Sequence, residues 1–104
     1  MPKFRQTRKE KYFAKSIDVT LITPSDQNYS ILEINCPDQS GVLACVAEVL
    51  ATSEIHIKDA RITTLGERVE DLFFITDKQG QPIVRKADSD KICDEIKHQL
   101  ENKL

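Results

Sequence analysis

The sequence of 104 residues contains three glycines, three cysteines and no long apolar run. So few glycines form no Gly-rich loop of the kind that cradles phosphates. Cys36, Cys45 and Cys93 show no CxxC or Cys/His metal spacing, so we interpret them as buried free thiols. Because no apolar run is long enough to span a bilayer and the amino terminus lacks the apolar core of a secretory signal, we expect a cytoplasmic protein with no membrane partner.

Charge is distributed unevenly along the chain. Residues 1–15 carry six Lys or Arg and one Glu, a net charge of +5, which leaves −7 for the remaining 89 residues. A basic arm before an acidic body indicates a linker cut from a larger protein, or a nucleic-acid tail. The acidic body would repel phosphates, so we expect no nucleic-acid partner. We predict an arm at 1–15 and one domain at 16–104, since 39% hydrophobic content supports one modest core.

The hydrophobic pattern predicts strand, strand, helix, strand, strand and helix. Alternating apolar residues indicate the strands, and apolar residues at helical spacing indicate the helices. The final helix has an apolar ridge and a plausible N-cap at Asp88 or Ser89. The helical stripe in the first helix consists of Val42, Leu43, Val46, Val49 and Leu50. The expected strands are 16–22, 29–36, 54–65 and 68–77, the expected helices are 41–53 and 88–104, and the ridge is Ile92, Ile96, Leu100 and Leu104.

Two of the expected strands carry unusual patterns. In 54–65 the apolar residues change parity, which predicts a bulge near Lys58 or Asp59. In 68–77 the unbroken apolar run 72–75 is typical of a central strand that is covered on both faces. Two helices on one face cannot supply both covers, so a second copy or another domain is expected on the outer face.

This order of elements predicts an α+β fold of the ferredoxin-like type. Such a fold has a four-stranded antiparallel sheet with both helices on one face. No strand is evident after the last helix, so the strand at 16–22 is expected to replace the usual last strand, beside 29–36.

At this point the sequence resembles a known family, the ACT domain, a small-molecule sensing module of amino-acid metabolism. The resemblance lies in "INCPDQSGVLACVAEVLATSEIHIKDARITT", which contains a turn similar to Asp-x-Pro-Gly-x-Leu, with Ser40 where proline is usual. The continuation "DARITTLGERVEDLFFITD" is similar to the C-terminal ACT domain of the bacterial PII uridylyltransferases, which are bifunctional uridylyltransferase and uridylyl-removing enzymes. Their catalytic domains have no counterpart in this chain. The resemblance makes 16–104 an ACT regulatory domain.

The resemblance also implies a ligand site between paired domains. Asp38 would face the ammonium of an amino acid, and Gly41, Val42 and Leu43 would offer backbone N–H groups to its carboxylate. Further implied site residues are Asn35 and Ser40 from the same copy and His56, Ile57 and Asp59 from its partner.

The residues also support simpler interpretations. Asp38 can cap the helix, and Gly41 can serve a special backbone angle. His56 can be a solvent-facing strand residue. The charged residues that precede the apolar run are interpreted as a solvated turn or docking surface; they are Glu67, Arg68, Glu70 and Asp71.

The leading hypothesis is a regulatory domain that senses an amino acid, glutamine by resemblance, and controls uridylylation and deuridylylation of the PII nitrogen signalling protein. The expected partners are that amino acid, a second copy or second ACT domain in a dimer, and the catalytic domains of a parent enzyme. The alternatives are a structural dimerisation domain without a ligand and a small enzyme. The sequence argues against catalysis, because it shows no nucleophile–base arrangement or metal cluster. We therefore expect no cofactor, no metal and no catalytic residue.

Overall fold

The computed structural model describes residues 17–38 and 40–103. The predicted arm at 1–15, Gln39 and Leu104 lie outside the described residues. Four strands and two helices follow one another in the predicted order. They are β1 (Asp18–Ile22), β2 (Ser30–Pro37), α2 (Val42–Thr52), β3 (His56–Leu65), β4 (Arg68–Thr76) and α3 (Lys86–Lys103).

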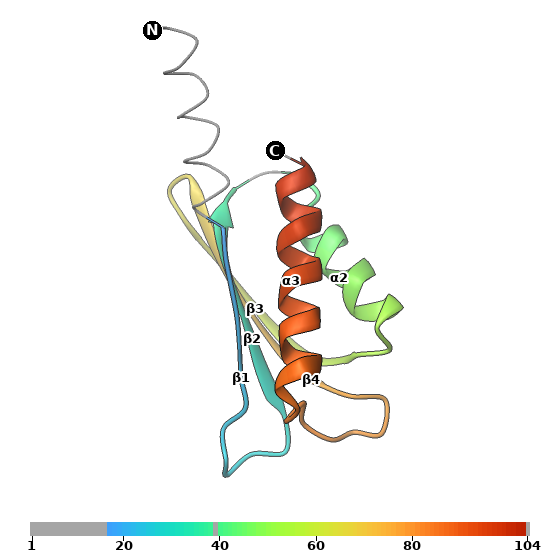
Figure 1. The fold of residues 1–104 in the computed structure, drawn as a ribbon. Helices are drawn as coiled ribbons and strands as arrows, with labels where there is room; N and C mark the ends of the chain where they lie inside the picture. The colour runs from blue at the N-terminus through green and yellow to red at the C-terminus, as the bar shows by residue number, and fades with distance from the viewer. Residues whose placement is uncertain (1–16, 39, 104) are drawn as a thin grey trace, which may run out of the picture.

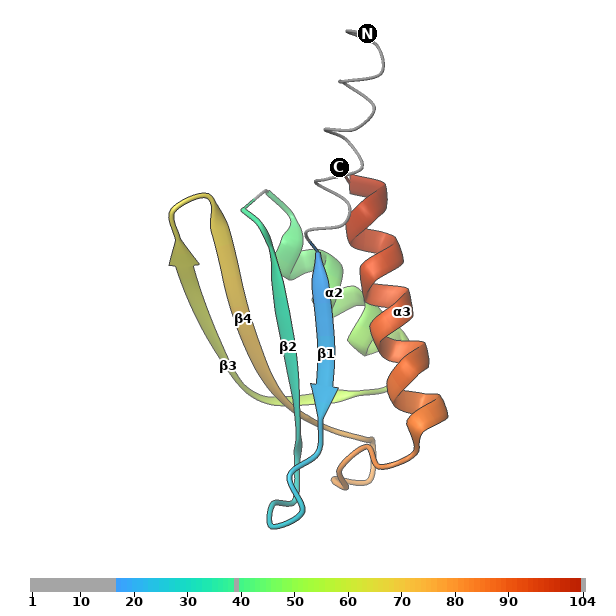
Figure 2. The same ribbon diagram turned by 60° about the vertical axis from the view of Figure 1, so that its left-hand side comes forward.

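The four strands form one antiparallel sheet in the order β1, β2, β4, β3. Both helices lie on the same face of this sheet (Figure 1), and the turned view shows β1 and β3 at its two edges (Figure 2). The amino-terminal strand β1 pairs with β2, at the position predicted for the strand that replaces the usual last one. The predicted ferredoxin-like architecture is therefore confirmed.

The core lies between the sheet and the two helices. Strand β2 alternates as predicted, with Leu32, Ile34 and Cys36 fully buried and the residues between them less so. Ile96 and Leu100 of α3 are also fully buried, which confirms the predicted ridge for the residues that the structure describes. The burial of these apolar side chains supplies most of the driving force for folding.

Two details of the helices differ from the sequence prediction. Leu43 was expected in the buried stripe of α2, but it is 48% exposed, and Cys45 is buried instead. Helix α3 begins at Lys86, so the predicted N-cap at Asp88 or Ser89 is wrong. The N–H group of Ser89 donates to the carbonyl oxygen of Arg85 at 3.0 Å, which starts the helix three residues earlier. Asp88 lies in the first turn, where a negative charge favours the helix dipole.

The patterns predicted for β3 and β4 are confirmed in register. Strand β3 shifts its pairing with β4 between Ile57 and Asp59, which is the predicted bulge. Strand β4 lies inside the sheet, between β2 and β3, as its apolar run predicts. Every residue of β3 is exposed, so this edge strand has little apolar cover from the rest of the described chain.

The outer face of the sheet carries aromatic side chains that shelter one another. The rings of Tyr29 and Phe74 meet edge to face, with centroids 5.5 Å apart. The guanidinium of Arg61 lies over the Phe74 ring at 5.6 Å, and the ammonium of Lys58 lies 6.0 Å from the centre of the Tyr29 ring. These contacts explain why Phe74 is half-buried although neither helix lies on this face.

Candidate ligand-binding site

The turn from β2 into α2 is built around Gly41. This residue is the N-cap of α2 and has φ 87° and ψ 1°, a left-handed conformation that glycine adopts without steric cost. Cys45 donates the first intrahelical hydrogen bond to the Gly41 carbonyl oxygen at 2.9 Å. The N–H groups of the first helical turn have no intrahelical acceptor, and they point out of the helix end. The special backbone angle predicted for Gly41 is confirmed.

Asp38 lies before this turn and does not supply a side-chain cap. No side-chain hydrogen bond caps α2 at Gly41, so helix capping by Asp38 or Ser40 is not seen among the described residues. Asp38 is instead held by a backbone hydrogen bond, in which its N–H group donates to the Glu67 carbonyl oxygen at 2.8 Å. This bond ties the β2–α2 turn to the β3–β4 turn at the same end of the sheet.

A cavity of about 330 Å³ lies where the first turn of α2 meets strands β3 and β4. It brings together four of the residues predicted for the site, namely Asp38, Gly41, Val42 and Leu43. The residues that sequence reasoning missed are Ala44, Ile62, Thr64, Val69 and Asp71. The cavity is therefore lined by residues of the first helical turn, by two aspartates and by apolar residues, and its volume is in the range that small ligands occupy.

Asp71 is the unexpected member of this site. Its side chain is only 1% exposed, and its Oδ1 atom has no hydrogen-bond partner among the described residues. The prediction that Asp71 belongs to a solvated charge cluster is therefore wrong. Asp71 shares its parity with Val69 and Phe73, which face the core. The alternation of β4 in the sequence therefore indicates that Asp71 faces the core as well.

Burial controls the protonation of the groups beside the cavity. Burial, and then the neighbouring Asp38 carboxylate, raise the pKa of Asp71. Burial, followed by the charge of Asp71, raises the pKa of the Cys36 thiol to about 11. Cys36 is therefore a protonated thiol at neutral pH, which agrees with its interpretation as a buried free cysteine.

The remaining predicted site residues do not line this cavity. Asn35 lies on the opposite face of β2, where its side-chain oxygen accepts hydrogen bonds from Arg68 and its side-chain nitrogen donates to Glu70. His56, Ile57 and Asp59 lie at the start of β3, whereas Ile62 and Thr64 of the same strand line the cavity. These three residues were predicted to act from a partner copy, and that role stays a prediction.

Comparison with known proteins places this architecture in a family. The family described as the ACR9-like, ACT-like domain matches residues 17–104. The chain belongs to the ACT-like domain family. No solved structure matches the chain.

The relatives of this ACT-like domain are much longer proteins. The bifunctional uridylyltransferase/uridylyl-removing enzyme of Pseudomonas aeruginosa is 38% identical over 100 residues, which are 96% of this chain and 11% of the relative. The protein of the same name from Pseudomonas entomophila is 42% identical over 79 residues, 76% of this chain and 9% of the relative. The ACT-like domain thus spans about a tenth of the length of these relatives and matches only a small part of each.

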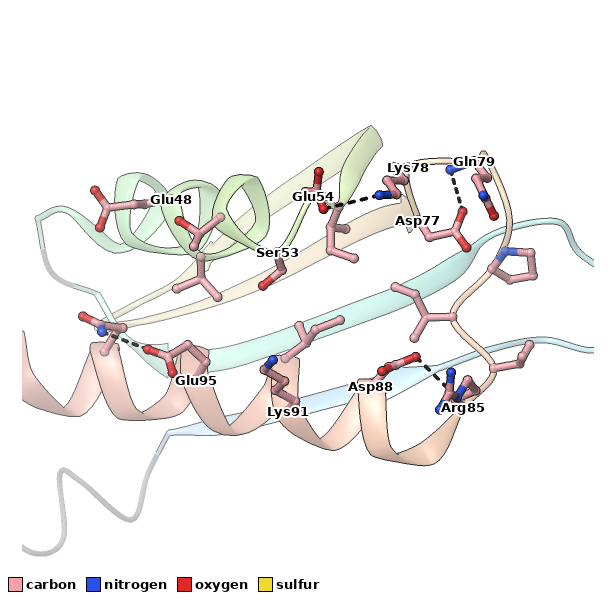
Figure 3. A pocket seen from close by; sticks show the side chains of 18 residues that line it. Glu48, Ser53, Glu54, Asp77, Lys78, Gln79, Arg85, Asp88, Lys91 and Glu95 are labelled. Carbon is pink, nitrogen blue, oxygen red and sulfur yellow. Dashed lines mark hydrogen bonds and ion pairs between the residues drawn. The ribbon is translucent and has the colours of Figure 1, made fainter.

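The ACT-like domain has a second, larger cavity of about 750 Å³ between α2, α3 and the segment after β4. Some of its charged side chains pair with one another (Figure 3). Lys78 pairs with Glu54 at 3.6 Å and Arg85 with Asp88 at 3.9 Å, while Asp77 accepts the N–H groups of Gln79 and Gln81. These exposed pairs contribute little energy. The smaller cavity, with its buried carboxyl group, is the stronger candidate site.

Two further observations concern metal binding and membrane spans. Among residues 17–38 and 40–103, no group of three or more His, Cys, Asp or Glu could hold a metal ion. Within the same residues, the helices are too short or too polar to cross a membrane.

Proposed function

We propose that this ACT-like domain is a regulatory module that senses an amino acid, glutamine, and conveys its occupancy to catalytic domains outside this chain. The observation that carries the proposal is the cavity at the β2–α2 turn, where helix N–H groups and carboxyl groups line one small space. An amino acid is a zwitterion, so it offers a carboxylate to the N–H groups and an ammonium to the carboxylates. The choice of glutamine rests on the similarity to uridylyltransferase/uridylyl-removing enzymes.

In such a parent enzyme, the domain would regulate uridylylation and deuridylylation of the PII nitrogen signalling protein. Coupling requires that glutamine bind one arrangement of the domains more tightly than another. The ligand would lie between two ACT-like domains, with residues His56, Ile57 and Asp59 of one copy completing the site of the other. Asn35 and Ser40 would support the turn rather than contact the ligand in the cavity.

The direct test is calorimetric titration of the chain with glutamine, with glutamate and alanine as comparison ligands. We expect saturable heat with glutamine and weaker binding of the other two. Absence of heat with glutamine, under conditions in which the chain is folded by circular dichroism, would contradict glutamine sensing.

A second test uses the Pseudomonas aeruginosa enzyme, of which this chain matches 11%. Deleting the matching segment should leave uridylyl transfer possible but blunt its response to glutamine. Full glutamine control after the deletion would refute the sensor role.

A structural interaction domain without a ligand is the second candidate function. The exposed edge strand β3 favours it, because Ile57, Ile62 and Leu65 are all more than two-fifths exposed. Exposed apolar side chains on an unpaired edge are suited to association. Under this function the chain would dimerise with equal affinity in the presence and absence of amino acids.

A further inference from the structure

A buried carboxyl group without a partner needs an explanation in any folded protein. Asp71 lies in the middle of the sheet, paired in register with Ile34 of β2 and Ile62 of β3. Both neighbours are apolar, and the Asp71 side chain is only 1% exposed. An apolar residue of similar volume would pack better here, because a buried carboxylate without a partner is strongly unfavourable.

The cavity beside Asp71 is acidic. Asp38 and Asp71 both line it, and among the described residues that line it none is Lys, Arg or His. Two carboxylates in one small space repel each other, and a cation placed between them would relieve that repulsion. The positive part of the site is the first turn of α2, formed by Gly41, Val42 and Leu43.

We propose that Asp71 is the group that receives the α-ammonium of the bound amino acid at the floor of this cavity, with Asp38 closing over the same ammonium from the turn. This inference rests on the function proposed above and assigns the specificity for α-amino acids to a buried strand residue. The carboxylate of the ligand then lies at the N–H groups of the α2 turn. A small movement of the cavity lining brings the ammonium to Asp71 Oδ1, which has no hydrogen-bond partner among the described residues.

A ligand ammonium should bind Asp71 more strongly than it binds Asp38. Asp38 is exposed, so water screens its interaction with an ammonium. Asp71 is buried, where a charge-assisted hydrogen bond is stronger and water competes less. Removing the Asp71 charge should therefore cost more affinity than removing the Asp38 charge.

The test is a cycle of two proteins and two ligands, measured by calorimetric titration of the full chain. The proteins are the wild type and Asp71→Asn, which keeps the size of the side chain. The ligands are glutamine and glutaramic acid, the glutamine analogue in which hydrogen replaces the α-ammonium group. We expect Asp71→Asn to weaken glutamine binding about tenfold or more and to leave the affinity for glutaramic acid unchanged within about twofold.

Two control variants sharpen this cycle. Asp38→Asn should weaken glutamine binding less than Asp71→Asn does. Glu33→Gln, an exposed residue on the outer face of β2, should leave it unchanged. Thermal unfolding of each variant verifies that it is folded.

Each remaining outcome overturns a specific statement. If glutamine binds the wild type and Asp71→Asn equally, or if both ligands lose affinity to the same extent, the assignment of the ammonium to Asp71 is wrong and the sensing function stands. If Asp38→Asn alone removes the preference for glutamine over glutaramic acid, the ammonium belongs to Asp38. If the folded wild type binds no amino acid, the proposed function fails, and the role of Asp71 fails with it.

Discussion

At the scale of a single residue, Asp71 is a buried carboxyl group in the middle of the sheet. Its neighbours in the sheet are apolar, so ionisation of its carboxyl group opposes folding. Because burial raises its folded pKa above the ordinary value of 3.8, the protonated form is the one that folding favours. Folding therefore carries no ionisation cost below pH 3.8, and the cost is complete once the pH exceeds the folded pKa.

The raised pKa of Asp71 predicts how the stability of Asp71→Asn depends on pH in the absence of ligand. The variant should gain stability relative to the wild type as the pH rises through the folded pKa of Asp71, because asparagine does not ionise. The difference should shrink as the pH falls through the folded pKa and reach its minimum below 3.8. Urea unfolding at several pH values measures it, with Glu33→Gln as the exposed control. A difference that does not change with pH would mean that the Asp71 charge is not the source of the cost.

At the same scale, Gly41 sets the backbone of the β2–α2 turn. Its φ of 87° is strained for any residue with a Cβ atom. Gly41→Ala should therefore lower the free energy of unfolding by about 1–2 kcal/mol. Ser40→Ala, at the preceding exposed position, is the matched control and should change stability by less than about 0.5 kcal/mol. Equal stability of Gly41→Ala and the wild type in chemical denaturation would show that the turn has another conformation in solution.

At the scale of elements, a buried serine connects β2 to the segment before α3. Ser30 is fully buried, and its hydroxyl oxygen accepts the Ile83 N–H group at 2.8 Å. The Thr23 hydroxyl lies 2.7 Å from that of Ser30 and donates to the Ile83 carbonyl oxygen at 2.6 Å. These bonds fix the approach of the chain to α3 against the first strand pair.

Ser30→Ala should break this connection by leaving the Ile83 N–H group buried without an acceptor. We expect a loss of about 1–3 kcal/mol in the free energy of unfolding. Ser25→Ala removes the same hydroxyl from an exposed turn and should have little effect. Faster amide exchange at Ile83 in Ser30→Ala would identify the broken bond, and unchanged exchange would contradict this account.

At the scale of the whole molecule, the exposed strand β3 predicts association. Its edge is unpaired among the described residues, and it carries exposed isoleucine and leucine side chains. We expect a dimer that buries more than roughly 1,000 Å². Sedimentation at high protein concentration should show this dimer.

A pair of variants separates the β3 edge of the sheet from its β1 edge as the interface. Ile57→Lys, on β3, should shift the chain to monomer, whereas Ile22→Lys, on the opposite edge strand β1, should not. Dissociation by Ile22→Lys alone would move the interface away from β3. A wild-type monomer would contradict the predicted dimer.

Local patterns in the sequence determined most of the fold of this domain. Periodicity gave the order of the elements, and the change of parity in β3 placed the bulge near Lys58. The predicted replacement of the usual last strand by the amino-terminal strand placed β1 beside β2. These features depend on residues that are close along the chain. The period of the apolar residues there distinguishes a helix from a strand.

The tertiary structure alone decided which residues share the candidate site. Asp71 and Gly41 are thirty positions apart, and they line one cavity only because β4 lies inside the sheet next to the start of α2. The sequence pattern grouped Asp71 with its charged neighbours, but the pleat directs Glu70 and Asp71 to opposite faces. Burial also depends on contacts between distant segments. The exposure of Leu43, and the lack of a partner for Asp71 Oδ1 among the described residues, therefore follow from packing and not from local pattern.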